Sequence, residues 1–288
     1  TLDRLRSDGS WDVVISPDPD LFLWASESSS ANRAVRAFYA VLERAPRARE
    51  AWRRADVVLA NSSGMRRYLE RHGVAAVGVP GGVNTSFFTP PSPDPRLDPD
   101  RAPASVHFLV YGRLSRKRKG SETAVRAIAR ACHAAQVEAR VTLFDAPPKG
   151  AAEPSLNTPE GIKLRWVLDP TQESLRDLYR EADLFVSAER RAGWCNTAAE
   201  AMACGAAVIC TRSGTEDFAV DGETAAVSRW AWPWALARRI RPFLADRDAR
   251  ARLARAGVRT IQEFSWERTA DRVEAAIQDA LRRRKARG

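Results

Sequence analysis

The stretch that decides the fold is residues 183–205, which read DLFVSAERRAGWCNTAAEAMACG. It begins with a short apolar run and ends with an alanine-rich segment that Gly205 closes. This order predicts a buried strand, a tight turn and a helix with a glycine at its carboxyl end. Because the backbone N–H groups at such a helix start attract anions, the segment indicates a phosphate-bearing ligand.

Before and after this stretch in the sequence, apolar runs alternate with helical patterns. The expected strands are residues 106–111, 139–144, 162–167, 184–187 and 207–210. Helical stretches stand between most of them, and strands that alternate with helices at this spacing form a parallel sheet with both faces covered. The sequence therefore predicts an α/β protein.

The ordered motifs resemble those of the family 4 glycosyltransferases, which are retaining enzymes of the GT-B fold. Residues 200–205 (EAMACG) and 213–216 (SGTE) match the family's C-terminal domain, and residues 111–114 (YGRL) with 119–120 (KG) match its Gly-Arg-Leu…Lys-Gly segment. The resemblance runs from about residue 50 to near the C-terminus. It implies two Rossmann-like domains that face each other across a cleft. The family's first strand and glycine-rich loop are not visible, so we expect the N-terminal domain to be incomplete.

The resemblance and the composition predict three parts. Residues 1–102 would hold the partial acceptor-side domain and a proline-rich linker, because prolines from 90 to 103 break helical and strand patterns. Residues 103–262 would bind the nucleotide-sugar. Residues 263–288 would form a helix that, in the resembled fold, crosses back to the N-terminal domain. The apolar stripe expected on that helix is Trp266, Ala270, Val273, Ile277 and Leu281.

A nucleotide-diphosphate leaving group needs fixed positive charge, and two residues are placed to supply it. Arg113 directly follows an expected strand and Gly112, at the strand end where parallel sheets bind ligands. By resemblance Arg113 and Lys119 hold the diphosphate and are catalytic. The family's lysine usually comes five residues after the arginine, which leaves Arg118 and Lys119 as alternatives, and the Lys-Gly pair favours Lys119. Without the family order, the loop would read as a solvated basic segment.

Two carboxylates complete the expected site. Glu200 matches the family's acid that accepts hydrogen bonds from the ribose hydroxyls. A second acid, which contacts the donor hexose, would fall at Ala192, where this chain has no carboxylate. Glu189 stands three residues earlier. Either an altered turn brings Glu189 to the same place as a catalytic residue, or Glu189 is structural and main-chain groups of residues 193–196 bind the sugar.

The turn and the helix start supply the other donor-binding candidates. Asn196 and Thr197 are typical of a helix N-terminus, where capping and phosphate binding use the same geometry. Trp194 either packs on the sugar or wedges the turn. The remaining expected donor-binding residues are Gly193, Cys195 and Glu216.

Composition limits the other function classes. The net charge is +10, from 46 basic and 36 acidic residues, but arginines are spread along the chain, so charge alone does not indicate nucleic acid. No apolar run is long enough for a membrane span, so we expect a soluble, cytoplasmic protein, and the basic charge is compatible with peripheral attachment to a membrane surface. The resemblance implies that neither a cofactor nor a metal is needed, with Arg113 and Lys119 supplying the charge that a metal would provide.

The resemblance thus implies metal-independent transfer, with retention, of a hexose from a nucleotide-diphosphate sugar, in glycan biosynthesis. The acceptor class stays open among a glycan, a lipid-linked molecule and a small molecule. The alternative is a degenerate GT-B domain that binds a nucleotide or polyanion without turnover, which Ala192 in place of an acid favours.

Overall fold

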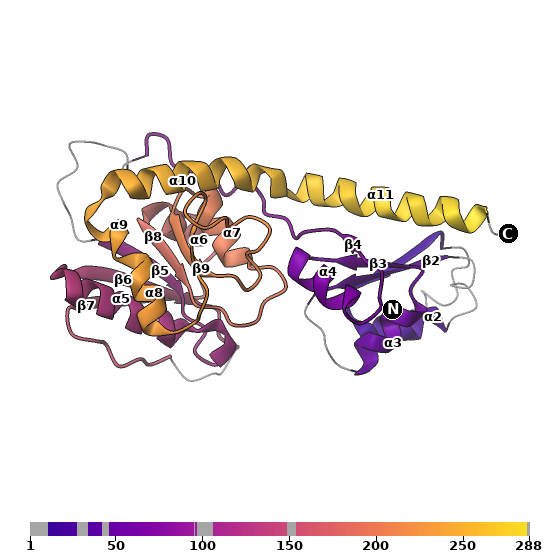
Figure 1. Ribbon diagram of the computed structural model, residues 1–288, viewed down its shortest axis with the longest axis horizontal. Helices are drawn as coiled ribbons and strands as arrows, with labels where there is room; N and C mark the ends of the chain where they lie inside the picture. The colour runs from indigo at the N-terminus through magenta and orange to yellow at the C-terminus, as the bar shows by residue number, and fades with distance from the viewer. Residues whose placement is uncertain are drawn as a thin grey trace. The chain divides into compact units, whose positions relative to one another are not determined.

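A computed structural model describes the chain over residues 11–27, 34–41, 46–94, 96, 106–148 and 154–286 (Figure 1). The chain divides into two compact units. Unit 1 comprises Thr1–Gly82 and Trp266–Gly288, and unit 2 comprises Val83–Ser265. Both are α/β units built on a parallel sheet, as the alternation of strands and helices predicts.

Unit 1 contains a parallel sheet in the order β1-β2-β3-β4. Its strands are β1 (Val13–Ser16), β2 (Val35–Ala40), β3 (Val57–Ala60) and β4 (Val77–Gly78). The helices between them are α2 (Pro19–Ser26), α3 (Pro46–Arg54) and α4 (Ser63–Glu70). Side-chain caps start two of these helices: Asp18 accepts the Leu21 N–H, and Ser62 accepts the Met65 N–H.

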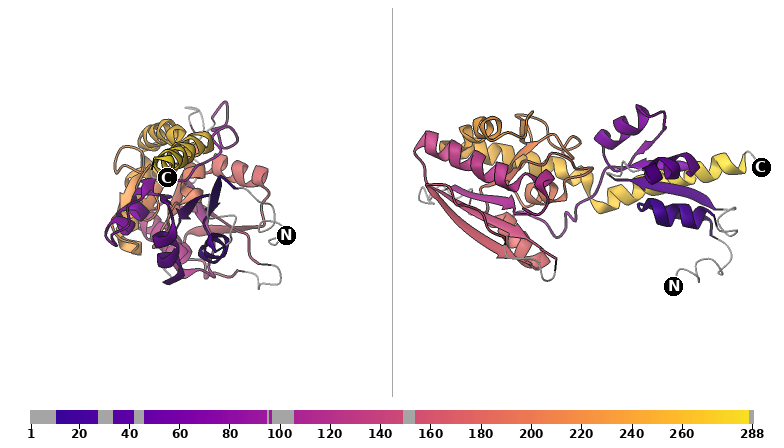
Figure 2. Two further views of the ribbon diagram at one scale, coloured as in Figure 1. Left: turned by 90° about the vertical axis from the view of Figure 1, so that its right-hand side faces the viewer. Right: turned by 90° about the horizontal axis from the view of Figure 1, so that it is seen from below.

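The last helix, α11 (Trp266–Lys285), is part of unit 1 and runs along its sheet, as Figures 1 and 2 show in yellow. It packs Ala276 and Ala280 against a core of β2 and β3 side chains. The expected stripe is wrong at its start, because Trp266 is 52% exposed and Ala270 is exposed. The buried face carries Thr269 and the two alanines, whose small side chains let the helix lie close to the sheet.

The division between the units lies earlier in the chain than the proline-rich segment. Phe88 is buried in the core of unit 2, and Arg96 donates to the carbonyl oxygens of Ala182 (3.2 Å) and Cys204 (2.8 Å). Prolines 90 and 91 therefore belong to a segment that is fastened to unit 2. Residues 95 and 97–103 of the expected linker lie outside the described residues.

Unit 2 contains a parallel sheet in the order β10-β9-β8-β5-β6-β7. Its strands are β5 (Val106–Tyr111), β6 (Ala139–Asp145), β7 (Ile162–Leu168), β8 (Leu184–Ser187), β9 (Ala207–Thr211) and β10 (Ala226–Ser228). The five strands expected from the sequence are confirmed, and β10 is an addition. The helical elements are η2 (Lys117–Lys119), α5 (Ser121–Ala135), α6 (Gln172–Glu181), α7 (Asn196–Ala203), α8 (Pro233–Ile240), α9 (Pro242–Ala245), α10 (Arg247–Ile261) and η3 (Gln262–Phe264).

The sheet of unit 2 is buried on both faces. Alternate side chains of β5 point to opposite sides, so Phe108 and Val110 join a core with α5 and α8, whereas Leu109 joins a core with α6 and α7. This two-sided burial explains why the strands read as continuous apolar runs rather than alternating ones.

The strand order places a topological switch point between β5 and β8. From β5 the chain proceeds to β6 and β7 on one side, and then returns to β8, β9 and β10 on the other. The helices that follow β5 and β8, α5 and α7, pack on opposite faces of the sheet, which is the arrangement of a switch point at the carboxyl ends of these two strands. In open parallel sheets ligands bind at this position.

Candidate functional site

The loop after β5 lies directly against the end of β8. Gly120 has a left-handed backbone (φ 69°), and a Cβ at this residue would lie 2.2 Å from the carbonyl oxygen of Ala188. At Gly112 a Cβ would lie 2.5 Å from the ring of Trp166. Gly120 therefore permits the close packing that brings the residues after β5 next to those after β8, whereas Gly112 permits a close approach to Trp166 of β7.

Lys119 and Glu189 meet at this point. The Lys119 ammonium donates to Glu189 Oε2 at 2.7 Å, and their side chains are only 20% and 3% exposed. The other carboxylate oxygen, Glu189 Oε1, is buried and accepts no hydrogen bond from the described residues. Burial raises the pKa of Glu189 above its ordinary value although Lys119 lowers it. Lys119 and Glu189 thus form a buried ion pair in which one carboxylate oxygen, Glu189 Oε1, can still accept a hydrogen bond.

The turn that follows Glu189 shows what Ala192 does. The Ala192 N–H donates to Ser213 Oγ at 2.8 Å, and a Cβ on Gly214 would lie 2.7 Å from the Cβ of Ala192. The Cys195 N–H donates to the Gly214 carbonyl at 2.8 Å. Ala192 therefore contacts the turn at residues 213–214, while the carboxylate of Glu189 lies beside Lys119.

Arg118 and Lys119, the two alternatives for the family's lysine, point to different partners. Arg118 Nη1 donates to the Arg191 carbonyl at 2.9 Å, and the Arg118 carbonyl accepts the Arg190 N–H at 2.8 Å. Arg118 thus fastens two loops by their backbones, whereas Lys119 contacts an acid. This difference favours Lys119 as the cation of the site.

Arg113 turns toward β6, and in the described part of the chain it forms no hydrogen bond or ion pair with Lys119 or Glu189. Its Nη1 donates to the Ala146 carbonyl at 3.0 Å and lies 3.7 Å from Asp145 Oδ1. Its Nε is buried without an acceptor in the described part of the chain. The guanidinium therefore has one hydrogen-bond donor that a ligand at the carboxyl edge can use.

Tyr111, which the sequence analysis did not select, lies between the two cations. Its hydroxyl lies 3.4 Å from Arg113 Nη1, and its ring centre lies 5.6 Å from Lys119 Nζ. The ring stacks on Phe144 at 5.3 Å. As the last residue of an apolar strand, Tyr111 is expected in the core. Only the three-dimensional arrangement reveals that it also contacts both Arg113 and Lys119.

Glu200 lies in α7 and receives a hydrogen bond from a buried tyrosine. The Tyr179 hydroxyl, from α6, donates to Glu200 Oε2 at 2.9 Å, and Tyr179 is fully buried. Burial raises the pKa of Glu200 from 4.5 to about 7, against the opposing effect of that hydrogen bond. Tyr179 carries no motif, so sequence reasoning missed it.

The structure positions the other donor-binding candidates around the start of α7. Cys195, not Asn196 or Thr197, occupies the N-cap, and its side chain makes no cap hydrogen bond. The first-turn amides of Asn196 and Thr197 precede any intrahelical partner and therefore face outward along the helix axis. Gly193 is buried in the turn that leads to this cap, and Glu216 is exposed in the turn that follows β9.

Trp194 packs within an aromatic cluster rather than standing free. Its ring lies 5.0 Å from Phe218 and 5.6 Å from Phe264, centre to centre. Its indole Nε1 is buried and has no acceptor in the described residues. The ring contacts are those of a wedge in the turn, and the N–H remains available to a ligand.

A cavity of about 650 Å³ adjoins this edge of the sheet beside the loop after β5. Its lining includes Arg113, Gly120 and Ser121, together with the exposed cations Arg116, Lys117 and Arg190. The cavity therefore presents mainly positive charge next to the Lys119–Glu189 pair, which suits an anionic ligand.

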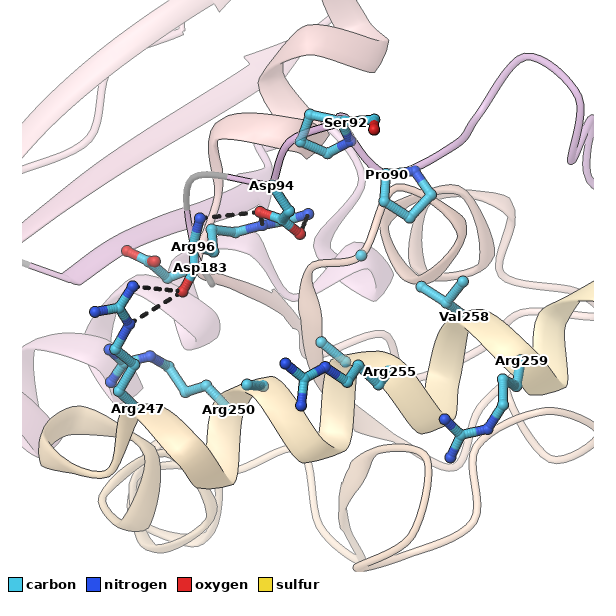
Figure 3. A pocket seen from close by; sticks show the side chains of 14 residues that line it. Pro90, Ser92, Asp94, Arg96, Asp183, Arg247, Arg250, Arg255, Val258 and Arg259 are labelled. Carbon is cyan, nitrogen blue, oxygen red and sulfur yellow. Dashed lines mark hydrogen bonds and ion pairs between the residues drawn. The ribbon is translucent and has the colours of Figure 1, made fainter. Parts of the chain in front are cut away.

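A second cavity, of about 460 Å³, lies at the opposite edge of the same unit (Figure 3). Asp183 and Gly205, which precede β8 and β9, form part of its wall, so it stands at the amino ends of these strands. Arginines of α10 line the other side: Arg247, Arg250, Arg255 and Arg259. Parallel sheets bind ligands at the carboxyl edge, so we assign the functional site to that edge, which the first cavity adjoins, and not to the second cavity.

Comparisons with known proteins indicate the family that the chain resembles and its fold. Residues 105–246 match the family described as "Glycosyl transferases group 1". The D-inositol 3-phosphate glycosyltransferase of Nocardiopsis dassonvillei is 29% identical over 235 residues, which cover 76% of this chain and 54% of the relative. The protein of the same name from Streptomyces avermitilis is 30% identical over 259 residues, with 80% and 54% covered. This chain spans about half the length of these relatives.

Solved structures show the fold. A sucrose-phosphate synthase from Thermosynechococcus elongatus matches with a TM-score of 0.76 at 19% identity, over 96% of this chain and 76% of that one. HepE from Anabaena, in complex with UDP, matches with a TM-score of 0.77 at 15% identity, over 96% and 81%. The protein therefore has the GT-B glycosyltransferase fold. In the described residues no helix is both long and apolar enough to cross a membrane.

Proposed function

We propose that the protein is a family 4 glycosyltransferase that transfers a hexose from a nucleotide-diphosphate sugar with retention of configuration and without a divalent cation. The observation that carries this proposal is a pair of buried polar atoms at the ends of β5 and β8. Arg113 Nε is a donor and Glu189 Oε1 is an acceptor, and neither has a partner in the described residues. A sugar diphosphate offers phosphate oxygens to the first and hydroxyls to the second.

Positive charge at the leaving group is the chemical requirement that these residues meet. Lys119 and Arg113 flank the loop after β5, and the first-turn amides of α7 add donors from the other side of the switch point. As the bond between the sugar and the diphosphate breaks, these groups stabilise the charge that develops on the leaving oxygen. Lys119 is already held in place by Glu189, so little reorganisation is needed at that moment.

The two carboxylates take separate parts of the donor in this proposal. Glu189 Oε1 accepts a hydrogen bond from a hydroxyl of the hexose, while Oε2 keeps Lys119 in position. Glu200 accepts hydrogen bonds from the ribose hydroxyls, and the Tyr179 hydroxyl orients the Glu200 carboxylate. A carboxylate that accepts two hydroxyls is a selective clamp for a ribose.

The relatives guide the choice of substrates to test. HepE binds UDP, and two sequence relatives are D-inositol 3-phosphate glycosyltransferases. UDP-hexoses are therefore the first donors to try, followed by GDP- and ADP-hexoses. D-inositol 3-phosphate is the first acceptor to try.

The test is a turnover assay in EDTA. The chain is incubated with each donor, with and without the acceptor, and the release of nucleoside diphosphate and the anomeric configuration of the first product are followed by ¹H NMR. Retention predicts that an α-linked donor gives an α-linked product. A β-linked product, or turnover that requires a divalent cation, would contradict the proposal.

Binding without turnover would favour the alternative of a degenerate domain. In that case UDP would bind in a Lys119-dependent manner, but no donor would be consumed even at high enzyme concentration. The same sample thus separates a site that binds from a site that also catalyses.

A further inference from the structure

Three exposed tryptophans stand together on the surface of unit 2. Trp230, Trp232 and Trp234 are 46%, 52% and 43% exposed, and they lie between β10 and the first turn of α8. Because β10 runs parallel to β9, they follow the carboxyl end of the sheet. They therefore occupy the same edge as Lys119 and Glu189, at the outer strand.

The three rings form an ordered stack. Trp230 and Trp232 lie 5.6 Å apart at an interplanar angle of 18°, and Trp232 and Trp234 lie 5.6 Å apart at 54°. The Arg229 guanidinium covers Trp230 at 4.9 Å from its ring centre. Ser228 donates to the Trp230 carbonyl at 2.8 Å, which fixes the turn. The stack is thus held in one arrangement before any partner binds.

The three tryptophans lie in a stretch of sequence that is basic. Residues 229–241 contain four arginines and no acid. Arg238 and Arg241 follow Trp234 by four and seven positions, so they extend along the same face of α8, and both are exposed. The opposite face of this helix buries Leu236 and Ile240. The outward face therefore combines indole rings with positive charge.

We propose that this surface, the tryptophan–arginine patch, docks the protein on a lipid bilayer that contains anionic lipids. The patch is Trp230, Trp232, Trp234, Arg229, Arg238 and Arg241. Indole rings favour the boundary between headgroups and acyl chains, where the apolar ring is buried and the N–H stays near water. The arginines meet the negative surface potential of anionic headgroups.

The geometry favours a bilayer over a soluble carbohydrate. A sugar stacks on the open face of an aromatic ring, but Trp230 already contacts both Arg229 and Trp232, and Trp232 also contacts Trp234. Insertion among lipid headgroups buries the exposed indole surface and requires no free ring face.

This inference goes beyond the proposed function and does not depend on it. Docking through the patch would hold the edge of the sheet that carries Lys119 and Glu189 close to the bilayer. The catalytic proposal concerns the ends of β5 and β8, whereas the patch follows β10. The two can therefore fail separately.

Vesicle flotation tests the proposal directly. The full chain is mixed with vesicles of phosphatidylcholine alone, or of phosphatidylcholine with phosphatidylglycerol, at constant ionic strength. We expect flotation with the anionic vesicles, and at least tenfold weaker partitioning after W230A/W232A/W234A. R238Q/R241Q should weaken partitioning by about 25-fold, because each basic residue near an anionic surface contributes about fivefold.

Matched variants keep this test specific. R282Q/R283Q removes the same charge from α11 in unit 1, and Lys119→Ala removes a cation from the candidate site, and both should float like the wild type. Phosphatidylcholine brominated along its acyl chains should quench tryptophan fluorescence, and W230F/W232F/W234F should remove most of that quenching. Thermal unfolding of every variant verifies that the chain is folded.

Three results would overturn the proposal. The first is equal loss of flotation in R238Q/R241Q and R282Q/R283Q, which would indicate a non-specific charge effect. The second is unchanged flotation after W230A/W232A/W234A. The third is a patch that instead binds soluble oligosaccharide, or that pairs two copies of the chain in sedimentation velocity with no affinity for vesicles.

Discussion

Gly120 and Ala188 are in such close contact that a Cβ on the glycine would lie 2.2 Å from the alanine carbonyl oxygen. This contact fastens the loop after β5 to the end of β8, the two strands that flank the switch point. The next residue on each side, Lys119 and Glu189, forms the buried ion pair. The position of the pair therefore depends on a glycine at residue 120.

Replacing this glycine should separate the two loops. Gly120→Ala adds a clash with backbone to the cost of a left-handed residue, so we expect the protein to be destabilised by about 2–4 kcal/mol and nucleotide affinity to fall. Chemical denaturation and calorimetric titration measure the two effects. Gly161→Ala is the matched control, because Gly161 is also left-handed (φ 76°) but has no atom within 4 Å of the added Cβ. Equal destabilisation by both changes would contradict this account of the contact.

Lys119 and its neighbour should differ sharply in activity. Lys119→Ala removes the cation that faces Glu189 and leaves that carboxylate buried without a partner, so kcat/KM should fall by about 10²–10³-fold. Arg118→Ala removes a bond to the Arg191 carbonyl and should cost less than tenfold. Steady-state kinetics with one donor compares the two variants. A larger loss in Arg118→Ala would transfer the role to that residue.

The affinity for a nucleotide-sugar should depend on pH through Glu200. The pKa of Glu200 is raised to about 7, and the ribose clamp requires the ionised carboxylate. Affinity should therefore be constant above pH 7.5 and fall by up to about tenfold per pH unit below 7. Titration calorimetry with a nucleotide-sugar is preferable to a free nucleoside diphosphate, whose terminal phosphate titrates near pH 6.

Two variants control this pH dependence. Glu200→Gln should bind weakly and show no change across pH 7. Tyr179→Phe removes the hydrogen bond that lowers the pKa of Glu200, so the midpoint should move to higher pH. A wild-type affinity that is flat from pH 6 to 8 would show that the ionisation of Glu200 does not govern binding.

The same carboxylate should destabilise the fold at alkaline pH. Its pKa is about 7 in the folded protein and about 4.5 when exposed, so between these values the folded state keeps a proton that the unfolded state loses. Stability from this group is therefore lost as the pH rises from 4.5 to 7. Glu200→Gln should stabilise the protein at pH 8 by as much as about 3 kcal/mol, and the gain should shrink toward pH 5. Denaturant unfolding at both pH values measures it.

A stabilising change that also abolishes nucleotide binding would mark Glu200 as a residue kept for function rather than for packing. If Glu200→Gln destabilised the protein at pH 8, the carboxylate would instead have a structural role. The two signs are opposite, so one variant distinguishes them.

Much of the architecture could be predicted from the sequence because the strands of unit 2 are short apolar runs between helical patterns. The order of β5 and β8 in the sheet could not, since register and neighbours depend on long-range packing. The stripe of α11 failed at Trp266, because the helix approaches its sheet through small residues and not through its largest apolar ones.

The residues of the candidate site could also be predicted from the sequence only in part. Arg113, Lys119, Glu189 and Glu200 follow strands or lie in motifs, so their residue types and positions in the chain point to them. Tyr111 and Tyr179 are aromatic residues in apolar or amphipathic segments and read as core. Their hydroxyl contacts depend on which elements pack together, which no local pattern encodes.

The central claim is that a nucleotide-sugar binds at the carboxyl ends of β5 and β8, and the most direct test is calorimetric titration of UDP-glucose in EDTA. The wild type should bind, Lys119→Ala and Glu200→Ala should each lose the heat of binding while remaining folded, and the double variant R255A/R259A, at the opposite edge, should bind normally. If R255A/R259A lost binding while Lys119→Ala and Glu200→Ala kept it, the site would lie in the second cavity and the account would be contradicted.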